Sequence, residues 1–93
     1  MKFTSERCAN FLVFYRDLPK AIETHIKADG RMSFIKDGVK KFGDQSCPRI
    51  TICVNTVDVA KDKQRVDALN RLLEQLESNN QIVGFKNKKI TIN

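Results

Sequence analysis

The 93-residue sequence has few of the side chains on which catalysis and metal binding depend. It contains no tryptophan, one tyrosine, one histidine and three cysteines. A structural zinc site needs about four Cys or His ligands, usually in close pairs, whereas this chain has neither a CxxC nor an HxxxH pair. An odd number of cysteines at unrelated spacings also disfavours a secreted disulfide framework. We therefore expect a protein with no metal site and no cofactor.

The sequence also lacks phosphate-binding loops and recognisable catalytic pairs. Its four glycines lie far apart and form neither a GxGxxG nor a Walker-type loop. His25 falls on the apolar side of an expected helix, where packing is a commoner role than activation of a cysteine. The polar groups that a small ribonuclease would need show no spacing that brings them together: Tyr15, Arg16, His25, Arg31 and Arg49. These absences predict a non-enzymatic protein with no small-molecule substrate.

Long apolar runs are missing as well. The longest, Phe11–Tyr15, covers five residues, whereas a membrane-spanning helix needs roughly 18. This run is also too short for the core of a signal peptide. We expect no membrane contact, a cytoplasmic location and a single domain over residues 1–93.

Two helices are predicted in the N-terminal third of the chain. The first is expected to begin at Thr4 or Ser5 and to reach Tyr15, because apolar residues recur there at helical spacing. The second, or a kinked continuation of the first, covers residues 18–28, with Pro19 in its first turn, where proline is well tolerated.

The middle of the chain predicts a strand followed by a long helix. Arg49–Asn55 is short and rich in β-branched residues, and alternate positions place three of them on one face: Ile50, Ile52 and Val54. The helix is expected to begin at Thr56 or Asp58 and to end near Ser78, because a strong stripe of leucine and valine residues runs through it.

Two further segments favour hairpins. Residues 31–42 predict either a hairpin that turns at Asp37-Gly38 or a short helix from Ser33 to Phe42. The last segment predicts a hairpin made of Gln81–Phe85 and Lys88–Ile92, with its tip at Asn87-Lys88. The expected fold class is α+β, in which a small, mainly antiparallel sheet with a C-terminal β-hairpin packs against two or three helices.

The positive charge is concentrated in two segments. The chain has a formal net charge of +6, of which residues 31–49 carry +3 and residues 81–93 carry +3, while the remaining residues balance. Both segments are expected to form strands and turns. The location of the positive residues is therefore a better indication of where a partner binds than the net charge of the whole chain.

The best candidate site is the basic C-terminal hairpin. Lys86, Asn87, Lys88 and Lys89 would place three cations and one amide at a turn, where they can contact phosphates and Asn87 can reach a base edge. A second patch is expected if the sheet brings the other strand cations alongside: Lys36, Lys40, Lys41 and Arg49. Lysines on edge strands also protect sheets from aggregation, and that interpretation stays open.

Two functions remain open from the sequence. The first is a small basic binding module that contacts nucleic-acid phosphates through its strand and hairpin lysines. The second is an inhibitor or adaptor that docks on an acidic surface of a larger complex. In general character the chain is similar to accessory and counter-defence proteins of phages and mobile elements. An exposed final strand, Ile90 to Ile92, could also pair with a second copy, so a homodimer is compatible with the sequence.

Overall fold

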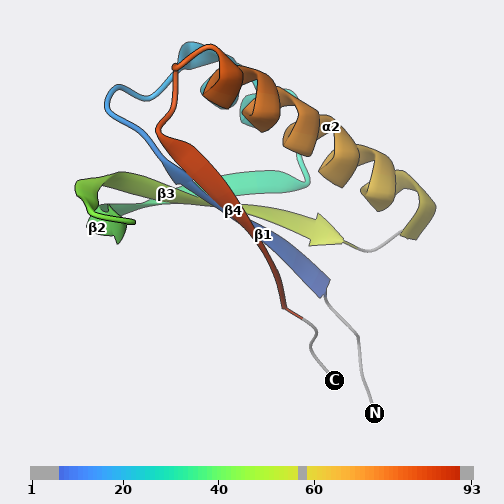
Figure 1. The fold of residues 1–93 in the computed structure, drawn as a ribbon. Helices are drawn as coiled ribbons and strands as arrows, with labels where there is room; N and C mark the ends of the chain where they lie inside the picture. Colours follow the sequence, from blue (N-terminus) through green and yellow to red (C-terminus); the bar gives the residue numbers. More distant parts are fainter. Residues whose placement is uncertain (1–6, 57–58, 91–93) are drawn as a thin grey trace.

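The part of the chain that the structure describes folds into four strands and two helices in the order βαββαβ. The computed structural model describes the backbone of residues 7–56 and 59–90 and the side chains of residues 9–55 and 63–87. The elements are β1 (Arg7–Phe14), α1 (Lys20–Lys27), β2 (Met32–Phe42), β3 (Gln45–Thr56), α2 (Val59–Ser78) and β4 (Gly84–Ile90). The sheet order is β2-β3-β1-β4, all pairs are antiparallel, and both helices cover the same face (Figure 1). This α+β arrangement has the split-βαβ connectivity, and it confirms the predicted antiparallel sheet.

Residues 7–14 form a strand, so the prediction of a helix up to Tyr15 is wrong. β1 lies inside the sheet, between β3 and β4. Phe11 and Val13 face the helices and are fully buried, yet Phe14 on the opposite face is also only 2% exposed. Because both faces of the strand are covered, its apolar residues are consecutive, and they imitate the pattern of a buried helix. The predicted helix start at Thr4 or Ser5 lies outside the described residues.

β2 is one strand of 11 residues, so neither the predicted hairpin at Asp37-Gly38 nor the alternative helix forms. The pairing with β3 shifts between Lys36 and Gly38, and Gly38 has a φ of 79°. Asp37 is therefore the extra residue of a β-bulge. The chain reverses further on, at Gly43-Asp44, where Gly43 has a φ of 63°, a conformation that favours glycine in two-residue turns.

The C-terminal segment is the single strand β4, and the predicted turn at Asn87-Lys88 is not formed. β4 pairs with β1 without interruption, from Gly84 opposite Phe14 to Ile90 opposite Cys8. The backbone groups on the inner side of β4 pair with β1 over this whole length, which holds the segment extended through the predicted turn. Residues 91–93, at the end of the predicted hairpin, lie outside the described residues. They include most of the segment Ile90 to Ile92, which was expected to pair with a second copy.

The long helix is confirmed, and its C-terminus has a regular capping motif. Three leucines of α2 join the core: Leu69, Leu73 and Leu76. Beyond Ser78 the backbone N–H of Asn80 donates to the carbonyl of Glu77 at 3.0 Å, and that of Gln81 donates to the carbonyl of Leu76 at 2.8 Å. With a φ of 60° at Asn80, these bonds form a Schellman motif. Asp58, one of the two residues expected to begin the helix, lies outside the described residues.

An ion pair connects α2 to the loop that follows α1. Arg65 Nε donates to Asp29 Oδ2 at 2.7 Å, and the backbone N–H of Arg31 donates to Asp29 Oδ1 at 3.0 Å. The hydrogen bond from Arg31 is the main cause that lowers the pKa of Asp29; burial opposes it, and Arg65 and the charge of His25 add to the lowering. The second helix of the N-terminal third is confirmed as α1. Within residues 7–56 and 59–90, neither helix has the length and apolarity to span a membrane.

Candidate nucleic-acid interface

One end of the helix-free face of the sheet is covered by the β2–β3 hairpin. We call this face the open face, and residues 38–48 the arm, because they continue past Phe14, the last residue of β1 (Figure 1). Phe42, at the end of β2, packs on Phe14 with ring centroids 4.7 Å apart and ring planes inclined by 42°. Cys47 of the arm is buried as well. The arm therefore encloses a small second cluster on the open face, separate from the main core.

Phe42 also reaches β4, at the other edge of the sheet. A Cβ atom at Gly84 would overlap Cζ of Phe42 and would lie 2.8 Å from its Cε2, so only glycine leaves room for the ring. β2 and β4 are separated by two strands in the sheet order, yet they meet at this contact. The contact thus joins the two segments that carry the positive excess, 31–49 and 81–93, at one point, where the end of β2 meets the start of β4.

Two cations from different strands lie over the paired rings of Phe14 and Phe42, which we call the ring pair. Lys86 of β4 places its Nζ 5.7 Å from the centroid of Phe42, and Arg49 of β3 places its Cζ 5.9 Å from the centroid of Phe14. Both distances fall within the range of cation–π attraction. Among the side chains that the structure describes, no carboxylate forms an ion pair with Lys86. Lys86 is exposed and can be reached by an anionic ligand, while the carboxylate of Glu77 lies on the same side of β4, 3.2 Å from the position of a Cβ at Gly84.

Arg49 is held by the bulge residue Asp37. Arg49 Nε donates to Asp37 Oδ2 at 2.8 Å, and Thr51 Oγ1 donates to the same oxygen at 2.6 Å. Partial burial of Asp37 raises its pKa, but the hydrogen bonds from Thr51 and Arg49 and the charges of Arg49 and Lys40 outweigh it, so the pKa is lowered. Asp37 is therefore ionised at neutral pH. Its negative charge partly neutralises the positive charge of Arg49, which was counted in full from the sequence.

The structure brings together three of the predicted cations. Lys86 and Arg49 flank the ring pair, and Lys40 is exposed on the arm. Lys40 lies opposite Cys47, so alternation along β2 places it on the same side as Phe42. Its charge contributes to the lowering of the pKa of Asp37, the residue that holds Arg49.

The other predicted residues do not join this group. Lys36 pairs with Ile50 and Asn87 pairs with Phe11, both core residues, so these two exposed side chains belong to the helix side of the sheet. Lys41 is exposed opposite Ser46, on the side of the arm away from the ring pair. Lys88 and Lys89 lie in β4, but their side chains are outside the described part of the chain.

The residues that organise the site were missed in the sequence. Phe14 and Phe42 are 28 positions apart, and nothing local indicates that their rings meet. Asp37 was assigned to a hairpin tip because Asp-Gly is a strong turn signal. The same dipeptide is compatible with a bulge, since Gly38 does adopt the positive φ that the signal implies.

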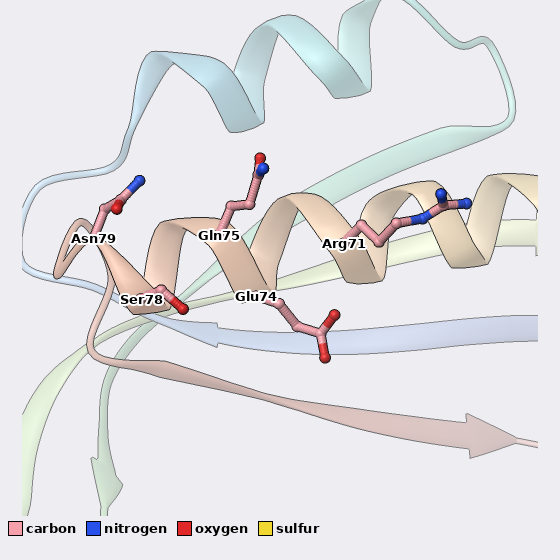
Figure 2. Close-up of a pocket in the computed structure, with 5 residues that line it drawn as sticks. All are labelled: Arg71, Glu74, Gln75, Ser78 and Asn79. Carbon is pink, nitrogen blue, oxygen red and sulfur yellow. The ribbon is translucent and has the colours of Figure 1, made fainter.

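Among the residues that the structure describes, a hollow also lies along the C-terminal half of α2. It has a volume of about 360 Å³ and is lined by Arg71, Glu74, Gln75, Ser78 and Asn79. All five are exposed, and Figure 2 shows them spread along both sides of the helix instead of converging on one point. In the described part of the chain, no group of three or more His, Cys, Asp or Glu side chains is placed to hold a metal ion.

Comparisons with known proteins add no assignment. No protein-family model, no curated protein and no solved structure matches this chain. Function is therefore inferred from the site itself, because a common topology hosts many unrelated functions.

Proposed function

We propose that the protein is a non-enzymatic module that binds single-stranded nucleic acid on the open face of its sheet. Lys86, Arg49 and Lys40 contact successive phosphates of the strand around the ring pair. The observation that carries this proposal is the meeting of Phe42 with Gly84, which joins the two basic segments of the chain at one place. Phosphate contacts of this kind supply most of the affinity in non-specific binding.

The rings support the cations and are not themselves a stacking platform. Phe14 is 2% exposed and Phe42 is half-buried beneath Lys86, so neither offers a free face to a base. Stacking of bases on aromatic side chains needs such a free face. Binding is therefore expected to depend strongly on salt and weakly on base sequence.

Edge protection accounts for the cations that lie outside this group. Lys36 and Lys41 are exposed on β2, whose outer edge is unpaired among the described strands. Lysine at such an edge hinders pairing with another sheet. We assign these two residues to that role, and we expect their replacement to change nucleic-acid affinity little.

The adaptor interpretation is favoured by one observation of its own. Ile35 and Val39, also on β2, are 65% and 66% exposed, and large apolar side chains on an edge strand are suited to a protein partner. Bulge geometry places them on opposite sides of the strand, so they do not form one patch. A stoichiometric protein that copurifies after nuclease treatment, and is lost in Val39→Lys, would favour the adaptor over the nucleic-acid module.

The test compares charge reversals on the two faces of the protein. Lys86→Glu removes a cation from the open face, and Lys20→Glu makes the same change in net charge at the exposed start of α1, where glutamate suits the helix dipole. Fluorescence anisotropy with an oligothymidylate of about 12 nucleotides, a length that spans one small binding site, measures both affinities.

Three phosphate contacts predict that the affinity of the wild-type protein falls about 20-fold between about 50 and 200 mM salt. Lys86→Glu should lower the affinity at least fivefold and make its salt dependence shallower, whereas Lys20→Glu should stay within about twofold of wild type. Equal losses in the two variants would show that only net charge matters, and would exclude the open face as the binding site.

A further inference from the structure

Arg49 is bound to the protein through one of its three guanidinium nitrogens. Its Nε donates to Asp37 Oδ2, while no described residue accepts a hydrogen bond from Nη1 or Nη2. The side chain is nevertheless confined, since it is only 24% exposed and its guanidinium lies over the ring of Phe14. A planar group held at Nε and supported by a ring keeps its two outer nitrogens as a fixed fork of donors.

Asp37 is itself fixed by Thr51. The Thr51 hydroxyl donates to the same carboxylate oxygen that accepts from Arg49, and the Asp37 side chain is only 11% exposed. Thr51 and Arg49 lie two residues apart on β3 and therefore share the open face. Thr51 holds Asp37, and Asp37 holds Arg49.

We propose that Arg49 binds one backbone phosphate of the strand in a bidentate manner, and that Asp37 and Thr51 are the residues that position it. This inference rests on the proposed function and assigns different roles to the cations of the same site. Arg49 recognises the shape of the phosphate through paired Nη donors, whereas Lys86 contributes a single mobile charge. No step of this recognition requires Arg49 to leave Asp37.

Exchanging arginine and lysine at the two sites separates the effect of the guanidinium's shape from the effect of its charge. Arg49→Lys keeps the charge and loses the fork, so affinity for the oligothymidylate should fall about tenfold, while the slope of affinity against salt stays that of the wild type. Lys86→Arg makes the converse exchange at a residue that acts only through its charge, and its affinity should remain within about twofold.

Thr51→Val tests the positioning without changing any charge. Loss of the hydroxyl frees the Asp37 carboxylate, so affinity should fall about threefold at an unchanged salt slope, and Thr51→Ser should restore it. Far-UV circular dichroism and thermal melting of each variant show whether the fold is retained. Thr51→Ser keeps the hydroxyl group that donates to Asp37. The affinities of Thr51→Ser and of the wild type can therefore be compared even if Thr51→Val is less stable.

The outcomes distinguish this inference from the function on which it rests. If the wild-type protein does not bind the oligonucleotide, the proposed function itself fails. If it binds, but Arg49→Lys and Thr51→Val bind equally well, the function stands and the bidentate role of Arg49 is wrong. An affinity loss in Arg49→Lys that comes with a shallower salt slope would also overturn the inference, because it would mean that a whole phosphate contact had been lost.

Discussion

The contact between Gly84 and Phe42 predicts a strong coupling between these two positions. Gly84→Ala adds a Cβ that would overlap Cζ of Phe42 and approach Glu77 Oε2 to 3.2 Å. The ring cannot move inward, because it already packs on the buried Phe14. The added methyl group must therefore push the ring outward, toward solvent and Lys86.

The magnitude follows from two opposing effects. Overpacking of this kind costs about 1–3 kcal/mol, whereas alanine in place of glycine in a strand gains about 0.5–1 kcal/mol. In the wild-type background Gly84→Ala should thus lower the free energy of unfolding by up to about 2.5 kcal/mol. In the Phe42→Ala background the obstacle is gone, and the same change should be neutral or stabilising. The coupling energy between the two sites equals the overpacking cost and is expected to be about 1–3 kcal/mol.

Urea denaturation of the wild type, the two single variants and the double variant measures this coupling. The unfolding transition is followed by far-UV circular dichroism, since the chain has no tryptophan. A cost of Gly84→Ala that is the same in both backgrounds, within about 0.5 kcal/mol, would show that the ring does not lie against Gly84. The arm would then not join the two basic segments.

Two further predictions concern stability. Asp29 and Asp37 have pKa values below their ordinary value of 3.8 in the folded protein. Their contribution to the free energy of unfolding is therefore complete above that value and is lost as the pH falls through the folded pKa. The urea midpoint should be level from about pH 7 to 5 and should fall below about pH 4. Asp29→Asn should reduce that fall, and an unchanged pH profile in this variant would contradict the assigned role of Asp29. Asn80→Gly should stabilise α2 by about 0.5 kcal/mol, because Asn80 has a φ of 60°, whereas Asn79→Gly should destabilise it. A stabilisation that is equal at both positions would argue against the left-handed cap.

Helices and strands that bury only one face were easier to predict from the sequence than those that bury residues on both faces. α2 and the strand around Ile52 each have a more exposed side, so their periods were visible in the sequence. The end of α2 at Ser78 was predicted correctly, whereas β3 begins at Gln45, four residues before the predicted start at Arg49. β1 buries one face against the helices, and on the other face the arm covers its last residue, Phe14, so its alternation was hidden. The turn signals at Asp37-Gly38 and Asn87-Lys88 failed for another reason: long-range pairing with β3 and β1 extends the strands through them.

The candidate site was predicted in its charges but not in its geometry. Lys86, Arg49 and Lys40 were identified because cations are visible in the sequence. Their grouping depends on the ring pair and on Gly84, which are contacts between residues far apart in the chain. The pairing of Arg49 with Asp37 could not be predicted either, because it requires the bulge that turns the carboxylate toward β3.

The location of the bound strand is the central claim, and amide chemical shifts test it most directly. A titration of the ¹⁵N-labelled protein with oligothymidylate reports which backbone groups change their surroundings. We expect the largest shifts at Gly84 and Lys86 of β4, at Lys40 and Phe42 of the arm and at Arg49, with little change along α1. Shifts concentrated on the helices, with these five amides unmoved at saturation, would contradict the account.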